Sequence, residues 1–245
     1  MAYVNQGEKY TYEDIESHLQ QYTQIVKQKK IESPVLILYE NLFQTFIMNL
    51  TLLQNEHIVI PVRKKNFEHG KNRYARSIID LTDSSIQFMH CSKKSDLPFT
   101  ASGIISVSPF DGCFNSYIDK SSFLRYKDEL TNLIRGHGIT SLDVSEHFGD
   151  CELLCIMLIG LINQIPIQVY SLYDNDQNCM TDALFISSME FQYVLQEQKF
   201  LASSVWFVHG LVGDSRKYSA LKQHPNVSVY TQLPWHPNGQ FWIYN

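Results

Sequence analysis

Two serines stand in the segment of this chain that is best placed to bind an anion. Gly103 to Val107 is a short apolar run that predicts a buried strand, with Ser106 inside it and Ser108 just beyond. A helix is predicted to begin near Ser121 or Ser122. A strand, a loop and a helix N-terminus together present backbone N–H groups to a phosphate.

The loop between this strand and helix departs from phosphate-binding chemistry. Loops that grip phosphate are rich in glycine and carry a lysine. Here Gly112 is the only glycine of the loop, and no basic residue precedes Lys120. The composition favours an ordinary connection over a nucleotide-binding loop.

Thiols and imidazoles offer a second chemistry. Cys151 and Cys155 share a helix face, but they sit among Leu, Ile and Met without further metal ligands nearby, which predicts buried core thiols and no metal site. Cys113 precedes a helix and could pair with His147 or His209 as a nucleophile and its base. A loop cysteine without chemistry remains the favoured interpretation.

The segment from Trp206 to Leu211 resembles the strand and oxyanion turn of α/β-hydrolases. Those enzymes place a G-x-S-x-G nucleophile elbow later in the chain. No such motif follows Gly210, after which 35 residues remain. A hydrolase, whether serine- or thiol-based, is therefore a minor alternative.

Composition and charge limit the classes of protein to which this chain can belong. The chain has 245 residues, of which 44% are hydrophobic, a net charge of -5 and a pI near 6.0, so nucleic acid is not an expected partner. Its N-terminus is polar, and its longest apolar run, Leu153 to Ile162, is too short to span a bilayer. Five cysteines without framework spacing predict reduced thiols and a cytoplasmic location. We expect a single compact unit with subdomains at residues 1–95 and 96–245.

Hydrophobic periodicity supplies the elements that must position these residues. Thr11 and Asp14 form the pattern of a capping box before a helix, and Val35 to Tyr39 is a continuous apolar run typical of a strand covered on both faces. The alternation of strands and helices predicts an α/β fold with a mostly parallel sheet. Further helices are predicted over residues 44–53, 71–81, 122–135, 151–162, 189–198 and 215–223, and further strands over 58–62, 86–90, 103–107, 139–144, 165–172, 183–186, 205–208, 227–230 and 240–244.

The order of elements resembles the acyl-adenylate-forming family, which includes acyl-CoA synthetases, adenylation domains of peptide synthetases and luciferases. These chains open with a Thr-Tyr pair before a helix, as Thr11-Tyr12 does here. They continue with a strand, a helix and the pattern L-x-A-G-A-x-x-x-P. The segment from Leu52 to Val62 keeps the spacing and Pro61 but lacks the alanine-glycine pair. The helix and strand predicted between Lys71 and His90 follow in the same order.

The later motifs of the family match loosely. Its phosphate loop, T-S-G-T-T-G-x-P-K-G, falls on Ser106 to Asn115, where Phe114 stands in place of the lysine. Its F-H or F-D segment resembles Glu146 to Gly149, and the glycine pair that faces adenine resembles His209-Gly210. Its Y-G-x-T-E motif falls near Tyr230 to Gln232, without the glutamate that helps to hold magnesium.

The resemblance implies a shortened, degenerate N-terminal domain of this family, with two stacked, mostly parallel sheets and without the C-terminal domain that carries the catalytic lysine. It implies an acyl-ligand-binding, regulatory or scaffolding module without full ligase activity, and leaves an active acyl-activating or acyl-transferring enzyme as the alternative. We expect no cofactor, with ATP or AMP disfavoured, and an acyl or aryl carboxylate or its thioester as ligand. A protein partner or self-association would use the aromatic C-terminal region, residues 235–244. The implied pocket is lined by Ser106, Ser108, His147, His209, Gly210 and Tyr230.

Overall fold

A computed structural model gives the fold. It describes residues 3–5, 8–67, 74–82, 86–91, 97, 99, 101–107, 114–146, 148, 150–170, 182–187, 190, 191, 193, 205–209, 228–232 and 242–244. The chain divides into two compact units. Residues 1–10 and 122–245 form the first unit, and Thr11–Ser121 forms the second.

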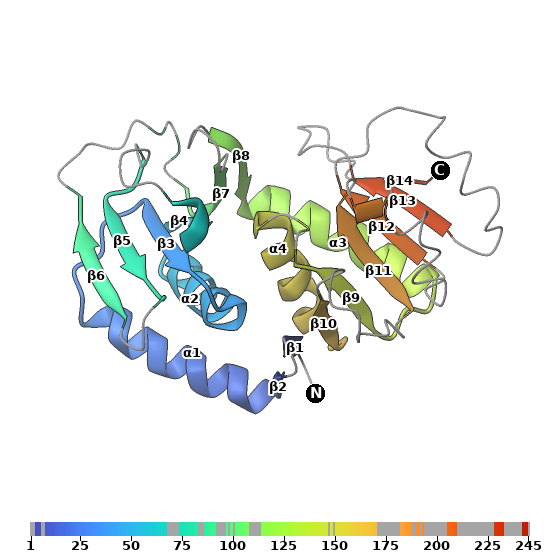
Figure 1. Ribbon diagram of the computed structural model, residues 1–245, viewed down its shortest axis with the longest axis horizontal. Coiled ribbons are helices and arrows are strands. Elements are labelled where there is room, and N and C mark those ends of the chain that lie inside the picture. The colour runs from blue at the N-terminus through green and yellow to red at the C-terminus, as the bar shows by residue number, and fades with distance from the viewer. Residues whose placement is uncertain are drawn as a thin grey trace. The chain divides into compact units, whose positions relative to one another are not determined.

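The first unit is built on an eight-stranded sheet with the order β14-β13-β12-β11-β9-β10-β1-β2. Its inner strands run parallel, whereas β14 and β2 are antiparallel to their neighbours. Figure 1 shows these strands with their labels. Their bounds are β1 (Tyr3–Asn5), β2 (Glu8–Tyr10), β9 (Leu142–Ser145), β10 (Ile167–Tyr170), β11 (Ala183–Ser187), β12 (Val205–His209), β13 (Ser228–Gln232) and β14 (Trp242–Tyr244).

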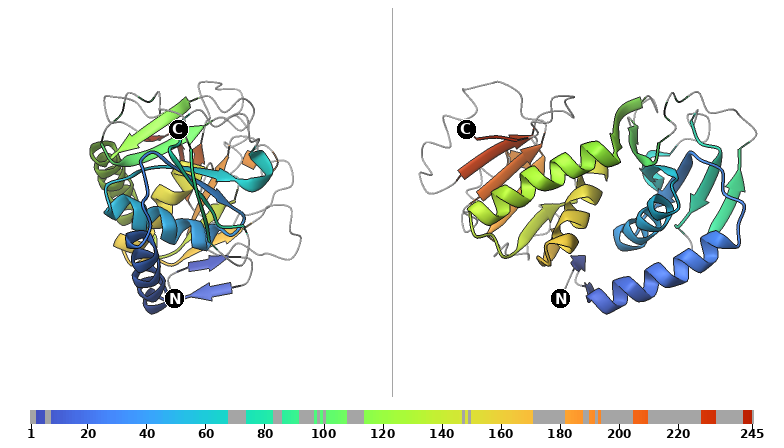
Figure 2. Two further views of the ribbon diagram at one scale, coloured as in Figure 1. Left: turned by 90° about the vertical axis from the view of Figure 1, so that its left-hand side faces the viewer. Right: turned by 180° about the vertical axis from the view of Figure 1, so that it is seen from behind.

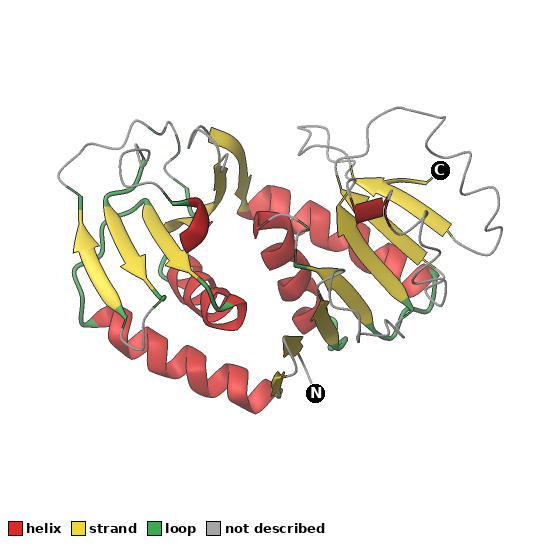
Figure 3. Ribbon diagram, in the orientation of Figure 1, coloured by secondary structure: helices red, strands yellow, loops and turns green. Residues whose placement is uncertain are grey.

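The second unit carries a six-stranded sheet with the order β6-β5-β3-β4-β7-β8. The four inner strands are parallel, and the edge strands β6 and β8 are antiparallel to their neighbours. Figure 3 shows the strands of both sheets in yellow. Their bounds are β3 (Val35–Tyr39), β4 (Ile58–Arg63), β5 (Ser77–Asp80), β6 (Gln87–His90), β7 (Gly103–Val107) and β8 (Phe114–Asp119).

Parallel strands need a crossover connection, and in the part of the chain that the structure describes a helix supplies it between β3 and β4 and between β9 and β10. The second unit contains α1 (Tyr12–Lys27), α2 (Leu42–Gln54) and a short 3-10 helix, η1 (Lys64–Asn66). The first unit contains α4 (Asp150–Ile162) and nearly all of α3 (Lys120–Gly136). Helix α1 packs on α2, and α2 packs on β3 and β4.

Local signals in the sequence set the helix N-termini. The predicted capping box is confirmed, since the Asp14 amide donates to Thr11 Oγ1 at 3.2 Å and the Thr11 amide donates to Asp14 Oδ2 at 2.7 Å. The side chain of Asn41 caps α2 in the same way, accepting from the Gln44 amide at 3.0 Å. These caps fix where each helix begins.

Helices α3 and α4 cover the same face of the eight-stranded sheet. A Cβ atom at Gly160 would overlap the side chain of Ile167 in β10, so α4 packs closely there. His137, just after α3, contacts Tyr230 in β13. The strand register aligns Ile167 with Leu142, Ala183, Val205 and Ser228, and Tyr230 lies two residues further along on the same face. Figure 2 shows α3 running across this face.

The predicted fold class is confirmed: the protein is α/β, with two mostly parallel sheets and four α-helices in the described residues. All five residues of β3 are buried, as its continuous apolar sequence predicts for a strand covered on both faces. Buried side chains at the centre of the first unit include Trp206 and Phe207. The predicted helices at residues 12–26, 44–53, 122–135 and 151–162 are all present, with bounds shifted by a few residues.

Two predictions of secondary structure are wrong. The helix predicted over 71–81 is replaced, in its described residues, by strand β5, where Ile78 and Ile79 pair with β3 and β6 and sheet packing overrides the helical pattern. The loop predicted after β7 contains β8, which pairs antiparallel with β7, so helix α3 follows a strand and begins at Lys120. The helix predicted at 215–223 lies outside the described residues, as does most of the one at 189–198.

The division of the chain also differs from the predicted subdomains at residues 1–95 and 96–245. The hairpin of β7 and β8 joins the second unit because β7 pairs with β4. The N-terminal strand β1, which the sequence did not suggest, joins the first unit because it pairs with β10. Pairing between strands distant in sequence therefore sets the boundary.

Candidate functional site

The strand order of the first unit reverses at β9. The chain passes from β9 through α4 to β10 on one side, and β11 then lies on the other side of β9. In open α/β sheets, ligands bind outside the carboxyl ends of the strands at such a reversal. The ends of β9 and β11 therefore define the candidate site, and their last residues are Ser145 and Ser187.

A buried carboxyl group joins these two strand ends. Glu190, which is 3% exposed, accepts a hydrogen bond from the Ser145 hydroxyl on Oε1. Its other oxygen, Oε2, accepts from the Ser187 amide at 2.9 Å and from the Ser187 hydroxyl at 2.8 Å. The Glu190 amide in turn donates to Ser187 Oγ at 3.3 Å. Each carboxyl oxygen is thus occupied by a donor from a different strand.

The bonds between Ser187 and Glu190 form a capping box, because each side chain binds the other residue's backbone amide. The sequence Ser187-Ser188-Met189-Glu190 has the S-x-x-E signature, which our sequence analysis did not single out. What the signature does not reveal is that the same glutamate also binds Ser145 on β9. The network therefore links Ser187 and Glu190 to the end of β9.

The predicted site residues fall in different parts of the molecule. His209 is the last residue of β12, level with Ser187 on β11 and Gln232 on β13, so its backbone lies at the candidate edge. Ser106 lies in β7 of the second unit, where it is partly buried. Ser108, His147 and Gly210 lie outside the described residues, so the six-residue pocket remains a prediction.

Tyr230 occupies the middle of β13, beside Phe207 of β12. Its hydroxyl lies 2.7 Å from Nε2 of His137, at the end of α3. Its ring is stacked on that of Phe207 with centroids 5.5 Å apart, and Phe207 is stacked on Phe185 at 4.4 Å. These contacts place Tyr230 in an aromatic row under α3. His137 thereby anchors that helix end to the sheet.

The segment predicted to hold phosphate belongs to a hairpin. Strand β7 ends at Val107, which pairs with Phe114 at the start of β8, and the register shifts between Ser106 and Val107. Phe114, which stands where the family has lysine, is therefore the first residue of a strand. The frame of strand, loop and helix N-terminus that the sequence suggested is not present at this position.

The carboxyl end of the second unit's sheet carries an ion pair. Lys64 Nζ donates to Asp80 Oδ2 at 2.7 Å and to the Thr82 hydroxyl oxygen at 2.9 Å. Thr82 also donates to Asp80 Oδ1 through its amide, at 3.0 Å, and through its hydroxyl, at 2.6 Å. Burial alone would raise the pKa of Asp80, but the hydrogen bonds from Lys64 and Thr82 outweigh it and lower the pKa below its usual value.

Cys151 and Cys155 are buried and form no disulfide bond, in agreement with their prediction as core thiols. Burial, reinforced by the nearby Glu152, raises the pKa of Cys155 well above its usual value, which disfavours the thiolate. Among the described residues, no three His, Cys, Asp or Glu side chains are grouped so as to hold a metal ion. None of the described helices is both long and apolar enough to cross a membrane.

Comparison with solved structures shows which fold the chain has. No family model matches the sequence, and no curated protein matches it. Solved structures do match. The N-terminal subdomain of NpsA from Klebsiella oxytoca superimposes with a TM-score of 0.69 at 13% identity, covering 99% of this chain and 71% of that one. The protein therefore has the fold of the N-terminal part of an adenylate-forming enzyme, as the resemblance predicted.

Two further structures define the same fold. MenE from E. coli, solved with a bound analogue of OSB-AMS, gives a TM-score of 0.64 at 13% identity, covering 95% of this chain and 56% of that one. VinN gives a TM-score of 0.68 at 9% identity, covering 95% of this chain and 70% of that one. This chain thus spans little more than half of the MenE chain.

Proposed function

We propose that this protein is an acyl-ligand-binding module with the fold of an adenylation domain and without full ligase activity. Its ligand is an acyl or aryl carboxylate, or the corresponding thioester, bound at the carboxyl edge of the first unit's sheet. His147, His209 and Gly210 are the proposed lining residues of this edge, whereas Ser106 and Ser108 belong to the second unit and Tyr230 lies in the middle of β13. In this role the protein would regulate or scaffold another acyl-handling enzyme.

The observation that carries the proposal is the charge of the candidate edge. The described residues at the ends of β9 and β11 supply the hydroxyls of Ser145 and Ser187 and the carboxyl group of Glu190, and none of the described residues at the ends of β9 to β13 is lysine or arginine. The charge on transferring phosphates is normally met by lysine, arginine and magnesium. An edge with this composition suits an uncharged or singly charged ligand better than a triphosphate.

The hairpin of β7 and β8 supports the same conclusion. Phe114 holds the position of the family's phosphate-binding lysine and is part of strand β8. Gln232, at the end of β13, lies near the position of the family's magnesium-binding glutamate. Removing a single donor that stabilises a transition state costs on the order of a hundredfold or more in rate. We therefore expect that the protein does not use ATP and magnesium to adenylate a carboxylate.

The test combines activity and binding. The purified protein should give no carboxylate-dependent ATP–pyrophosphate exchange above a boiled control. In thermal melts, ATP with magnesium should leave the melting temperature unchanged, whereas one member of a panel of fatty acids, aryl acids and acyl-CoA thioesters should raise it. A ligand at a hundred times its Kd stabilises by about 2.7 kcal/mol, which a melt detects. His209→Ala, checked for folding by circular dichroism, should abolish the shift.

A second function is favoured by one comparison. The NpsA N-terminal subdomain has been solved in complex with 3-hydroxyanthranilyl-AMSN and with 3-hydroxybenzoyl-AMSN, so this fold binds such analogues in that protein. An active acyl-activating enzyme with altered motifs is therefore the alternative. Robust exchange, or a melt shift with ATP that His209→Ala removes, would establish it and overturn the degenerate-module proposal.

The cysteines and the aromatic C-terminal region bear on the location and partners of the protein. None of the described cysteines Cys91, Cys151 and Cys155 forms a disulfide bond, which favours a cytoplasmic location. The aromatic C-terminal region, of which β14 pairs with β13, is the proposed surface for a protein partner or for self-association. Analytical ultracentrifugation of the protein with and without Trp242→Ser would detect self-association.

A further inference from the structure

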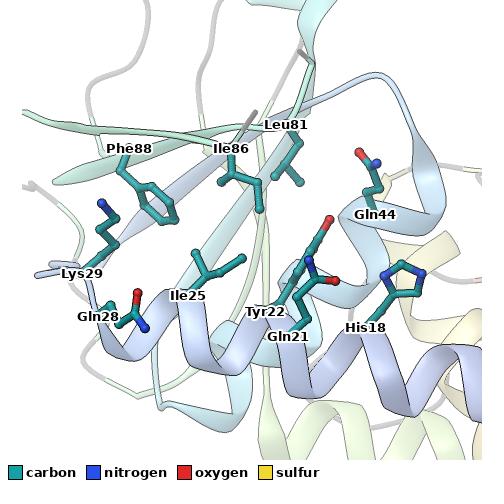
Figure 4. A pocket seen from close by; sticks show the side chains of 10 residues that line it. All are labelled: His18, Gln21, Tyr22, Ile25, Gln28, Lys29, Gln44, Leu81, Ile86 and Phe88. Atoms are coloured by element: carbon teal, nitrogen blue, oxygen red, sulfur yellow. The ribbon is translucent and has the colours of Figure 1, made fainter. Parts of the chain in front are cut away.

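A groove lies within the second unit between α1 and the edge strand β6, far in sequence from the candidate site. Its volume is about 540 Å³, within the range of small-molecule sites. Figure 4 shows Lys29 and Phe88 at one end and His18 and Gln44 at the other. The groove is lined by His18, Gln21, Tyr22, Ile25, Gln28, Lys29, Gln44, Leu81, Ile86 and Phe88.

The lining combines an apolar wall with a single permanent charge. Ile25, Leu81, Ile86 and Phe88 supply the wall, and glutamine amides supply hydrogen-bond donors and acceptors. Lys29 Nζ lies 5.6 Å from the centroid of the Phe88 ring, a cation–π distance. None of the lining residues is an aspartate or a glutamate, although the chain as a whole is acidic. The groove is thus locally complementary to an anion that carries an apolar body.

The aromatic side of the groove is held rigid by neighbouring rings. His18 meets Phe43 edge-on at 5.4 Å and Tyr22 edge-on at 6.4 Å, so its imidazole is oriented by packing. Burial raises the pKa of Tyr22, so its phenol stays protonated and can donate a hydrogen bond to a ligand oxygen. Preorganised polar groups of this kind reduce the entropy cost of binding.

Sheet topology marks the same place independently. The strand order of the second unit reverses at β3, since α2 leads from β3 to β4 on one side and β5 lies on the other. Gln44 lies in the first turn of α2, immediately after β3, and Leu81 immediately follows β5. One end of the groove therefore opens at a point where open α/β sheets bind ligands.

We propose that this groove binds a small organic monoanion, a carboxylate on an aromatic body, with the carboxylate near Lys29 and the ring against Phe88 and Ile86. A single negative charge fits because the groove provides one permanent cation. This site belongs to the second unit alone and goes beyond the function proposed for the carboxyl edge of the first unit.

Calorimetric titration of the full-length protein with 2-naphthoate tests the proposal, with the neutral 2-naphthamide as the matched probe. Wild-type protein should bind naphthoate more tightly than naphthamide. Gln28→Glu places a carboxylate in the groove beside Lys29 and should weaken naphthoate binding about fivefold, the order of an exposed charge pair. Gln24→Glu adds the same charge one helical turn away, on an exposed position outside the lining, and should have little effect. Lys29→Gln should weaken binding about fivefold, and Lys27→Gln is its control.

Three results would overturn the proposal. The first is the absence of naphthoate binding to wild-type protein. The second is equal binding of naphthoate and naphthamide, which would show that Lys29 selects no charge. The third is an equal loss in Gln28→Glu and Gln24→Glu. If His209→Ala removes naphthoate binding and Gln28→Glu does not, the ligand occupies the carboxyl edge, so the groove proposal fails while the proposed function is supported.

Discussion

Replacing Glu190 by glutamine changes one atom in the network at the reversal point of the first unit. The carboxyl group accepts from the Ser145 hydroxyl on one oxygen and from the amide and hydroxyl of Ser187 on the other. A glutamine amide keeps one acceptor and turns the second into a donor. Its oxygen is best directed at Ser187, because a backbone N–H can only donate, so the NH₂ group must face Ser145.

The magnitude follows from these three bonds. Hydrogen bonds to a charged group contribute about 1.5–3 kcal/mol and neutral ones about 0.5–1.5 kcal/mol. Glu190→Gln makes two bonds to Ser187 neutral and forces the Ser145 hydroxyl to accept instead of donate. Because Glu190 is only 3% exposed, water cannot replace what is lost. We expect the free energy of unfolding to fall by about 1–3 kcal/mol.

Urea denaturation at pH 7 followed by tryptophan fluorescence measures this loss. Trp206 is fully buried in β12 and meets Phe191 edge-on at 6.0 Å, so its emission reports on the first unit. The melting temperature should fall by about 2–4 °C for each kcal/mol. Asp128→Asn is the control: the Asp128 side chain is 68% exposed, and its neutralisation should change stability by less than about 0.5 kcal/mol.

A double-mutant cycle with Ser145→Ala separates the network from general damage. If the Ser145 hydroxyl acts through Glu190, the two substitutions should be coupled by at least about 0.5 kcal/mol. An unchanged urea midpoint in Glu190→Gln, or strict additivity in the cycle, would refute the assignment of this network as a stabilising link between β9 and β11.

Three further predictions address other contacts. Hydrogen bonds from the hydroxyl and the amide of Thr140 lower the pKa of Asp182. The Asp182 carboxylate therefore stabilises the fold above its unfolded pKa of about 3.9, and this contribution is lost as pH falls through the lower folded pKa. Between pH 5 and pH 3, the urea midpoint of Asp182→Asn should decline less than that of wild type. Gly103→Ala should destabilise the hairpin of β7 and β8 by about 1–3 kcal/mol, because its Cβ would lie 2.6 Å from the carbonyl oxygen of Ile118, and an unchanged melt would contradict that packing. Tyr230→Phe should lower the free energy of unfolding by about 0.5–1.5 kcal/mol, because it removes the hydrogen bond to His137 at the end of α3. If the variant keeps full stability but loses ligand binding, the Tyr230 hydroxyl contacts the ligand instead.

Sequence patterns predicted the fold class well because buried parallel strands leave a strong signal. The run from Val35 to Tyr39 is apolar throughout and buried throughout. The capping box at Thr11 was equally readable, since its partners lie three residues apart. Strand β5 was missed because a four-residue strand with a polar residue at each end carries too little periodicity to exclude a helix.

The candidate site was harder to predict because its contacts cross the sequence. Ser145 and Glu190 are 45 residues apart and meet only because β9 and β11 are neighbours in the sheet. The order of strands, which no local pattern records, creates that meeting. His137 likewise approaches Tyr230 across 93 residues. A prediction limited to motifs along the chain finds the S-x-x-E cap but not the third partner.

The buried carboxyl group at the strand reversal bears directly on the ligand of this protein. An anion bound about 6 Å from Glu190, in surroundings with an effective dielectric constant of about 20, would be opposed by about 3 kcal/mol for each of its charges. A triphosphate multiplies that cost, and the described residues of this edge offer no lysine or arginine to offset it. A carboxylate incurs the cost once and a thioester not at all. We therefore expect this chain to favour a ligand with little or no charge near Glu190, although the same fold binds 3-hydroxyanthranilyl-AMSN in NpsA.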